Sequence, residues 1–514
     1  DELDRDELVR LCRSIARVCG VTVLDPFDNE YPTPQALGLP DNLKIIETRS
    51  MGCVLAVEAL WQRLGLKKLF SDLIKQKHLR MPYERALLAM VANRLCAPES
   101  KLGVWDRWLQ TVYLPSCQDL KLRHIYEAMD LLYEHAAEVE KTLFFEVANL
   151  FNLTVDLIFY DTTTASFSVD WEDDDPDADN LRKFGHSKEG TWSPQVVVAL
   201  AVTREGLPVR CWVFPGNTPD TQTVKQIRDD LRGWKLGRTM FVADAGVNSK
   251  DNRQELARAC GKYLMATRMS NTAEVKQQVL TKKGRYTAIQ DNLFAKEVIV
   301  GDGERRRRYI LCYNPKEARR QQNHREHLVT LLEEELARHP KNDASAQWAI
   351  ELLASRRFKR YLTVSKSNRL RINKAKIREA QRYDGKWVLE TNDDTISLED
   401  AACGYKGLMV IERCFRSLKR TQIKLTPMYH WAPRRIETHV RICVLALLIE
   451  RVAELECGMP WHKIRTALGK LQATKFFNLN HSFFCRNEPT QDVRKVLKDL
   501  KIQLPKPVFQ VEKR

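Results

Sequence analysis

The chain lacks the features that mark a membrane-spanning protein or one held together by disulfides. No run approaches the roughly 18 apolar residues that a spanning helix needs. The longest apolar run, residues 442–449, is flanked by Arg441 and Glu450, so we expect a core helix there. The first residues show no signal-peptide pattern. The 13 cysteines include no CxxC pair, which argues against a zinc ribbon or a disulfide framework and fits reduced thiols in a cytoplasmic protein.

Positive charge is what the chain has in excess. It contains 83 Lys and Arg residues against 67 Asp and Glu residues, for a formal net charge of +16. A surplus of this size indicates a polyanionic partner, and nucleic acid is the usual one. An anionic membrane surface is the competing interpretation, but the sequence offers no basic amphipathic anchor. The length of 514 residues is enough for about two to four domains with substantial cores.

We expect five regions along the chain. Residues 1–150 carry apolar residues at helical spacing and predict a helical N-terminal region that serves in DNA-end binding, dimerisation or structural support. In residues 151–270 apolar strands alternate with helices, which predicts the first part of an α/β core with a mixed sheet. Residues 271–392 look like a β-rich insertion domain, residues 393–475 return to the core as helices, and residues 476–514 form a C-terminal tail.

Two apolar strands of the predicted core end on a carboxylate. Residues 155–160 lead into Asp161, and residues 238–243 lead into Asp244. A lone Asp at a strand end is usually a turn residue. If the two strands are neighbours, however, both carboxylates meet at one edge of the sheet, where they can hold hard cations such as Mg²⁺. Two such ions about 3.5–4 Å apart can activate a nucleophile and stabilise the leaving oxygen of a phosphodiester.

A later helix offers a third carboxylate, Glu412. Tyr405 and Lys419 lie seven residues before and after it, which is two helical turns, so the three side chains share one face. Arg416 lies one turn further on and can pair with Glu412. Taken alone, this pattern is also typical of a salt-bridged surface helix.

Five linked motifs resemble those of the insertion-sequence DDE transposases. The resemblance is to the branch with a β-rich insert between the second Asp and the Glu, the relatives of the Tn-five transposase, and it covers about residues 150–455. It implies an RNase H-like catalytic fold. The motifs, in chain order, are FYDTTTASF, GHSKEG with SPQVVVAL, GLPVRCWVFPGNTPDTQT, FVADAGVNS and YKGLMVIERCFRSLK.

The resemblance implies roles for individual residues. Asp161, Asp244 and Glu412 match the catalytic, metal-binding triad of the family, which takes two Mg²⁺ ions per active site, with Mn²⁺ as a substitute. Tyr405 and Lys419 match the outer positions of the family's Tyr-Arg-Glu-Lys signature, whose basic members contact phosphates near the transposon end.

The chain departs from that signature at Leu408, where the family has an Arg. This departure puts one phosphate contact in doubt, and Lys406 or Arg416 can replace it. Asp220 follows the GNTP motif, and we expect it either to shape the loop beside the site or to cap the next helix.

Five further residues are candidates for DNA contact. His186 and Lys188 lie in the GHSK loop, and for them substrate contact and a role in loop structure are equally open. Trp387 lies in the insert, where relatives stack an unpaired base on a Trp, but a core position is the favoured alternative. Arg434 and Arg435 enter the last long helix and either meet the DNA backbone or are only solvated.

The sequence therefore predicts a DDE transposase of a bacterial or archaeal insertion sequence, cytoplasmic and associated with the nucleoid. By resemblance, a metal-activated water cleaves the phosphodiester at the element's end, and the freed 3′-hydroxyl attacks target DNA. The expected partners are the terminal inverted repeats and target DNA, bound by a homodimer or larger assembly, without a membrane. The alternatives are an RNase H-like nuclease without strand transfer and an inactive, transposase-derived DNA-binding protein.

Overall fold

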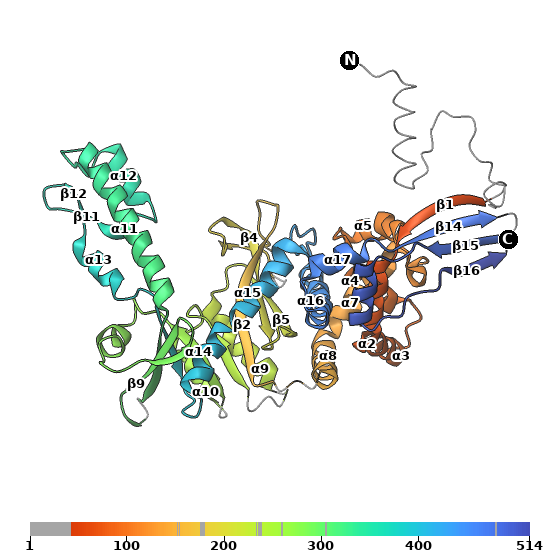
Figure 1. Cartoon of the computed structure of the whole chain (residues 1–514), viewed down its shortest axis with the longest axis horizontal. Helices are drawn as coiled ribbons and strands as arrows, with labels where there is room; N and C mark the ends of the chain where they lie inside the picture. Colours follow the sequence, from red (N-terminus) through yellow and green to blue (C-terminus); the bar gives the residue numbers. More distant parts are fainter. Residues whose placement is uncertain are drawn as a thin grey trace, which may run out of the picture.

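The computed structural model describes residues 43–513, apart from residues 152, 154, 175–179, 233, 235–238, 259–260, 304–305 and 479–480. The first 42 residues of the predicted helical region therefore lie outside the described residues. Figure 1 shows an elongated molecule, with the helices of the insert at one end, a sheet formed by both ends of the described chain at the other, and the main sheet between them.

The main sheet has the strand arrangement of an RNase H-like core, as predicted. Its central strand β2 (Leu157–Ser166) pairs antiparallel with β4 (Trp192–Val202) and parallel with β6 (Met240–Ala243). On the outer sides, β5 (Pro208–Pro215) pairs antiparallel with β4, and β7 (Lys262–Thr267) pairs parallel with β6. The order is thus β5-β4-β2-β6-β7, three antiparallel strands followed by two parallel ones.

Both faces of the main sheet are covered, because residues of β2 alternate between two cores. Phe159 belongs to the larger core, which continues into the helices of the N-terminal region and of the C-terminal half. Tyr160 belongs to a smaller core under α9 (Asp220–Arg232) and α10 (Lys250–Ala257). Strands buried on both faces read as nearly continuous apolar runs, which is the pattern of β4 from Val196 onward and of the first four residues of β2.

β2 is longer than the sequence analysis predicted. We expected the strand to stop at Asp161, but it continues to Ser166 and stays paired with β4 along that length. The threonines after Asp161 are β-branched residues that favour strands, and their small side chains fit a buried position. Asp161 is therefore the place where pairing with β6 ends, and not the end of the strand.

The first and last strands of the insert extend the main sheet. They add in the order β13-β10-β9-β8 next to β7, each antiparallel to its neighbour. Their bounds are Thr287–Gln290 (β8), Leu293–Val300 (β9), Arg307–Tyr313 (β10) and Lys386–Thr391 (β13). The insert therefore shares a continuous sheet with the α/β core.

The rest of the insert forms a helical arm with a small core of its own. Its longest element, α11, has 24 residues and begins at an Asn314 cap followed by Pro315. The elements of the arm are α11 (Pro315–Arg338), α12 (Gln347–Ala354), β11 (Leu362–Val364), β12 (Leu370–Ile372) and α13 (Lys374–Gln381).

The N-terminal region is helical after its first strand, as predicted. Its main helices are α2 (Gly52–Arg63), α3 (Leu66–Gln76), α4 (Tyr83–Cys96), α7 (Leu122–Glu134) and α8 (Ala136–Leu150). The long helix α16 (Pro433–Cys457) packs against α4, α7 and β5, and so joins this region to the main sheet. Residues 442–449 are buried in it, as expected of a core helix. None of the described helices is both long and apolar enough to span a bilayer.

Residues 472–513 fold and do not form a simple tail. Three strands, β14 (Gln472–Asn478), β15 (His481–Arg486) and β16 (Val508–Lys513), join β1 (Leu43–Ser50) in a four-stranded sheet. Phe476 and Phe483 stack across β14 and β15 with ring centroids 5.7 Å apart. Helix α17 (Trp461–Leu468) precedes β14 in the chain, and helix α18 (Gln491–Asp499) lies between β15 and β16.

Candidate active site

Asp161 and Asp244 occupy matching positions on two adjacent segments of the sheet. Tyr160 of β2 is paired with Ala243, the last residue of β6, in the parallel register, so the next residue along each segment is a carboxylate. Neighbouring strands lie about 4.8 Å apart. The side chain of Asp161 is partly exposed and that of Asp244 is exposed, so both carboxylates are accessible at one edge of the sheet.

Helix α14 (Leu398–Lys406) and helix α15 (Met409–Arg416) form a corner that lies directly on β2. A Cβ at Gly407 would lie 2.7 Å from Cζ of Phe159, which is closer than packed carbon atoms can approach. The glycine therefore permits the corner to touch the strand that carries Asp161.

The corner places Tyr405 against the two strand aspartates. The Tyr405 hydroxyl donates a hydrogen bond of 2.8 Å to Oδ1 of Asp244. Burial and the negative charges of Asp244, Asp161 and Glu412 raise the pKa of Tyr405, so the phenol stays protonated as a donor. One phenol thus lies within electrostatic reach of all three residues of the predicted triad.

The surroundings of Asp161 disfavour the ionised form of its carboxyl group. Burial raises its pKa to about 6, and the negative charges of Asp244 and Asp220 add to the shift, while Lys188 and the backbone N–H of Thr162 oppose it. That N–H donates to Oδ1 of Asp161 at 2.7 Å. Burial is thus the main reason that Asp161 holds a proton more tightly than a free aspartate.

Asp220 is a fourth carboxylate beside the site, at the start of α9. Its Oδ1 accepts a hydrogen bond of 2.6 Å from Oγ1 of Thr162, and its Oδ2 lies 2.9 Å from Nζ of Lys188. Lys188 also lies 4.0 Å from Oδ1 of Asp161. The ammonium of Lys188 thus lies between two carboxylates, where a cation is electrostatically favoured. Asp220 therefore lies beside the site, which is one of the two roles expected for it.

Glu189 connects the GHSK loop to the helix that follows Glu412, and the sequence analysis missed it. Its Oε1 lies 3.0 Å from Nζ of Lys419 and 2.9 Å from the guanidinium of Arg420. Hydrogen bonds from Arg420 and Lys419 lower the pKa of Glu189. The only sequence signal was its position next to Lys188, because the partners lie more than 200 residues away.

The other residues of the helix face differ in their surroundings. Glu412 is exposed on α15, and Arg416 is exposed and lines a groove along α16. Between these two described side chains there is no ion pair, contrary to the pairing that their spacing allows. Lys406 is exposed at the end of α14. Leu408 is only 8% exposed and belongs to the main core, so its side chain is not accessible to DNA.

The remaining candidates for DNA contact lie outside the carboxylate cluster. The ring of His186 meets that of Trp192, with centroids 4.7 Å apart. Trp387 is partly buried and packs against the main core, which is the core position weighed against base stacking. Arg435 forms an ion pair of 2.7 Å with Asp130 of α7, and Arg434 lies 3.6 Å from the same carboxylate.

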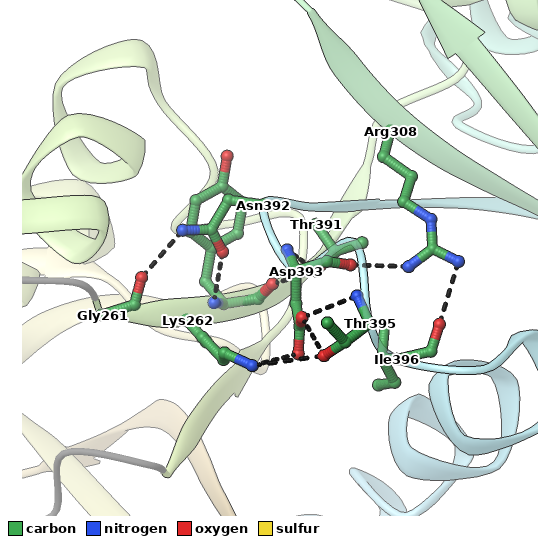
Figure 2. A network of polar contacts seen from close by, with 9 residues as sticks. Gly261, Lys262, Arg308, Thr391, Asn392, Asp393, Thr395 and Ile396 are labelled. Carbon is green, nitrogen blue, oxygen red and sulfur yellow. Dashed lines mark hydrogen bonds and ion pairs between the residues drawn. The ribbon is translucent and has the colours of Figure 1, made fainter.

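The loop that leads from the insert into α14 is fixed by a polar network (Figure 2). Asp393 is its centre: Lys262 donates to its Oδ2 at 2.9 Å, and Thr395 donates to its Oδ1 from both N–H and hydroxyl groups. The guanidinium of Arg308 donates to the carbonyl groups of Asp393 and Ile396 at 2.6 and 2.9 Å. The network ties α14, which carries Tyr405, to strands β7 and β10.

The oxygen donors of the site suit a hard divalent cation. Carboxylates are the ligands that Mg²⁺ prefers in proteins, and Asp161 and Asp244 are both at least partly exposed. Within the part of the chain that the structure describes, however, no three His, Cys, Asp or Glu side chains are gathered closely enough to form a metal site. The oxygen donors fit a divalent cation, but Glu412 does not join the two aspartates in one cluster.

Comparison with known proteins identifies a family for this chain. A family model described as "Transposase DDE domain" matches residues 166–449, a span that includes Asp244 and Glu412 and begins just after Asp161. No curated protein matches the chain.

Two solved structures show similarity to the chain. The piggyBac transposase synaptic complex with hairpin DNA has 10% identity and a TM-score of 0.33, over 75% of this chain and 70% of that one. The Mos1 transposase paired-end complex with left transposon end has 13% identity and a TM-score of 0.14, over 50% of this chain and 66% of that one. Because the family model matches more than half of its length, the chain belongs to the family of transposases with a DDE domain.

Proposed function

We propose that the chain is a DNA transposase that cuts phosphodiester bonds at the ends of a DNA element and joins the resulting 3′-hydroxyl groups to target DNA. The observation that carries the proposal is the parallel register of β2 and β6, which makes Asp161 and Asp244 neighbours at an accessible edge of the sheet. The family membership and the net charge of +16 support the same function.

Asp161, Asp244 and Glu412 are the residues that would hold Mg²⁺, with Mn²⁺ as a substitute. When bound, two such ions supply nucleophile activation and charge neutralisation at the phosphodiester. Glu412 would be the third ligand, since its charge is close enough to contribute to the raised pKa of Tyr405. Tyr405 holds the carboxylate of Asp244 in one orientation through its hydrogen bond.

Basic residues around the carboxylates would position the DNA backbone. Lys188 lies beside Asp161 and Asp220. If cations took its place at these carboxylates, its ammonium group would be free to contact a phosphate of the DNA. Lys406 and Arg416 are exposed on the same corner as Glu412 and are available for phosphate contact. We expect the active assembly to contain at least two copies of the chain on paired DNA ends.

The test uses the full chain and a plasmid that carries the genomic DNA flanking this reading frame, because the ends of an element enclose its transposase gene. Mg²⁺ is expected to produce cuts that leave 3′-hydroxyl groups and to yield products joined to a second, supercoiled plasmid. Asp161→Asn, Asp244→Asn and Glu412→Gln should each lower cutting at least 100-fold. Asp229→Asn on α9 and Glu334→Gln on α11 are matched controls at exposed positions.

Each outcome separates one function from the others. Cutting without joined products identifies a nuclease that lacks strand transfer. DNA binding without cutting by the wild-type chain identifies an inactive DNA-binding protein. Cutting that survives Glu412→Gln removes Glu412 from the triad.

A further inference from the structure

A basic cavity lies outside the carboxylate site, between the end of α4, the segment at residues 98–102 and the loop that follows Lys419. Its volume is about 310 Å³, and none of its lining residues belongs to β2, β6, α14 or α15. Its ionic and imidazole side chains are those of Arg94, Glu99, Lys101, Lys424, His430 and His439. Glu99 is the only carboxylate among them, and it pairs with Arg107 at 3.0 Å.

Lys101 is the most deeply buried cation in the cavity, with 3% of its surface exposed. Its Nζ lies 3.3 Å from Nδ1 of His439, while Nε2 of that ring lies 3.1 Å from the carbonyl oxygen of Leu425. A carbonyl only accepts, so Nε2 carries the hydrogen and Nδ1 accepts from Lys101. This bond uses one of the three N–H groups of Lys101, and among the described residues no Asp or Glu forms an ion pair with it.

Arg94 adds a second buried cation to the same wall, at 5% exposure. Its guanidinium donates to the carbonyl of Lys424 and to Oδ1 of Asn93, both at 3.2 Å, and its Nε is buried without a partner. Burial and the charge of Arg94 lower the pKa of Lys101 to about 7. The charge of Glu99 acts on Arg94, but neither buried cation forms an ion pair with a described carboxylate. Such cations are costly to bury, and an anion in the cavity would satisfy both.

We propose that this cavity binds a phosphate group through Lys101 and Arg94, and that a phosphodiester of bound DNA supplies it. Tyr429, an aromatic residue with 66% of its surface exposed, lines the same cavity. Exposed aromatic rings next to cations are the combination that nucleic acid contacts. Only the choice of DNA as the source rests on the proposed function. Free phosphate has the same chemistry and is the other source.

The first experiment uses inorganic phosphate as the probe. Phosphate, compared with chloride at equal ionic strength, should raise the thermal midpoint of the wild-type chain and of Lys68→Met, a matched variant at an exposed lysine of α3. It should not raise the midpoint of Lys101→Met. Equal stabilisation of Lys101→Met, or no stabilisation of the wild type, would overturn the proposal.

The second experiment identifies the source of the phosphate. For duplex DNA, Lys101→Met should reduce the slope of log K against log salt concentration by about 0.9, the value for one lost phosphate contact, and Lys68→Met serves as the charge-matched comparison. A Lys101-dependent phosphate effect with an unchanged slope supports the cavity and assigns it to free phosphate. Stabilisation of the chain by phosphate does not require DNA cleavage. A wild-type chain that does not cut DNA would therefore contradict the proposed function without contradicting the phosphate site.

If Lys101→Met does not fold, the wild-type chain still provides the test. Acetylation of Lys101 by acetic anhydride, followed by mass spectrometry, should fall in the presence of phosphate while acetylation of Lys68 stays constant. Unchanged acetylation of Lys101 at saturating phosphate would contradict the proposal.

Discussion

The hydroxyl of Tyr405 donates a hydrogen bond of 2.8 Å to Oδ1 of Asp244 and so joins α14 to the residue that follows β6. The bond crosses from a helix of the C-terminal half to a strand edge of the first half. It links the α14–α15 corner directly to one of the two aspartates.

Tyr405→Phe should lower Mg²⁺-dependent cutting about 10- to 100-fold, the usual cost of losing a partner that orients a metal ligand. The loss should appear as a higher Mg²⁺ requirement, because the carboxylate of Asp244 is no longer held in one orientation. A titration of cutting rate against Mg²⁺ measures it. Tyr83→Phe is the matched control, since that hydroxyl donates to the carboxylate of Glu127 at 3.0 Å, away from the site. Equal effects of the two substitutions would refute a specific role for Tyr405.

Gly407→Ala should destabilise the fold by about 1–3 kcal/mol, the usual cost of overpacking, and should also reduce cutting. The new Cβ would meet the ring of Phe159 at 2.7 Å and push the corner off β2. Urea denaturation and the cutting assay together measure the effect. Gly284→Ala is the control, because its Cβ would lie 3.8 Å from its nearest neighbour. Adding Phe159→Leu to Gly407→Ala should restore part of the loss, and a double variant no better than the single one would count against this contact.

Asp393→Ala should cost about 2 kcal/mol, because it leaves Lys262 and Thr395 without their acceptor in the network of Figure 2. Burial opposes ionisation of Asp393, but the hydrogen bonds from Thr395 and Lys262 prevail and lower its pKa. Its contribution is therefore present above the unfolded-state pKa and is lost as pH falls through the lower folded-state value. Asp394→Ala is the neighbouring control: it removes only an exposed ion pair with Arg306 and should cost under about 1 kcal/mol. Denaturation curves with equal losses for the two variants would contradict this assignment.

Glu450→Gln should stabilise the chain at pH 8 and have little effect near pH 4. Burial raises the pKa of Glu450 from 4.5 to about 7, with the charge of Glu454 adding to the shift and a hydrogen bond from Ser417 opposing it. The folded state therefore holds this proton more tightly than the unfolded state. Stability falls as pH rises from about 4.5 to about 7, by at most about 3 kcal/mol.

Free energies of unfolding at several pH values measure the effect of Glu450→Gln. Glu334→Gln, at an exposed position, should leave the pH dependence unchanged. A Glu450→Gln variant with the pH dependence of the wild type would show that another group is responsible.

The parts of the structure that could be predicted are those whose signal is local. The apolar runs before Asp161 and Asp244 identify two core strands, and the strand order then makes the two residues neighbours. The threonines after Asp161 misled the prediction, because polar residues in a buried strand look like a turn. The link from Glu189 to Lys419 could not be read from spacing, since its two ends meet only through the folded sheet.

The basic cavity could not be predicted for the same reason. Lys101 and His439 come from opposite ends of the chain, and each is unremarkable in its own segment. The pairing of β1 with β14 also joins residues more than 400 positions apart. A sequence pattern has no means of indicating such a partner, because each strand is short and its alternation of polar and apolar residues is weak.

The pairing of β1 with β14 has a consequence for synthesis of the protein. β1 leaves the ribosome early, while its partner strand is translated after almost the whole catalytic core. During that interval the edge of β1 is open, and its exposed Ile45 and Ile46 add an apolar surface that favours association with other chains. The core sheet, with Asp161 and Asp244, can form before the terminal sheet closes, so the nascent transposase acquires its central strands before its two ends are joined.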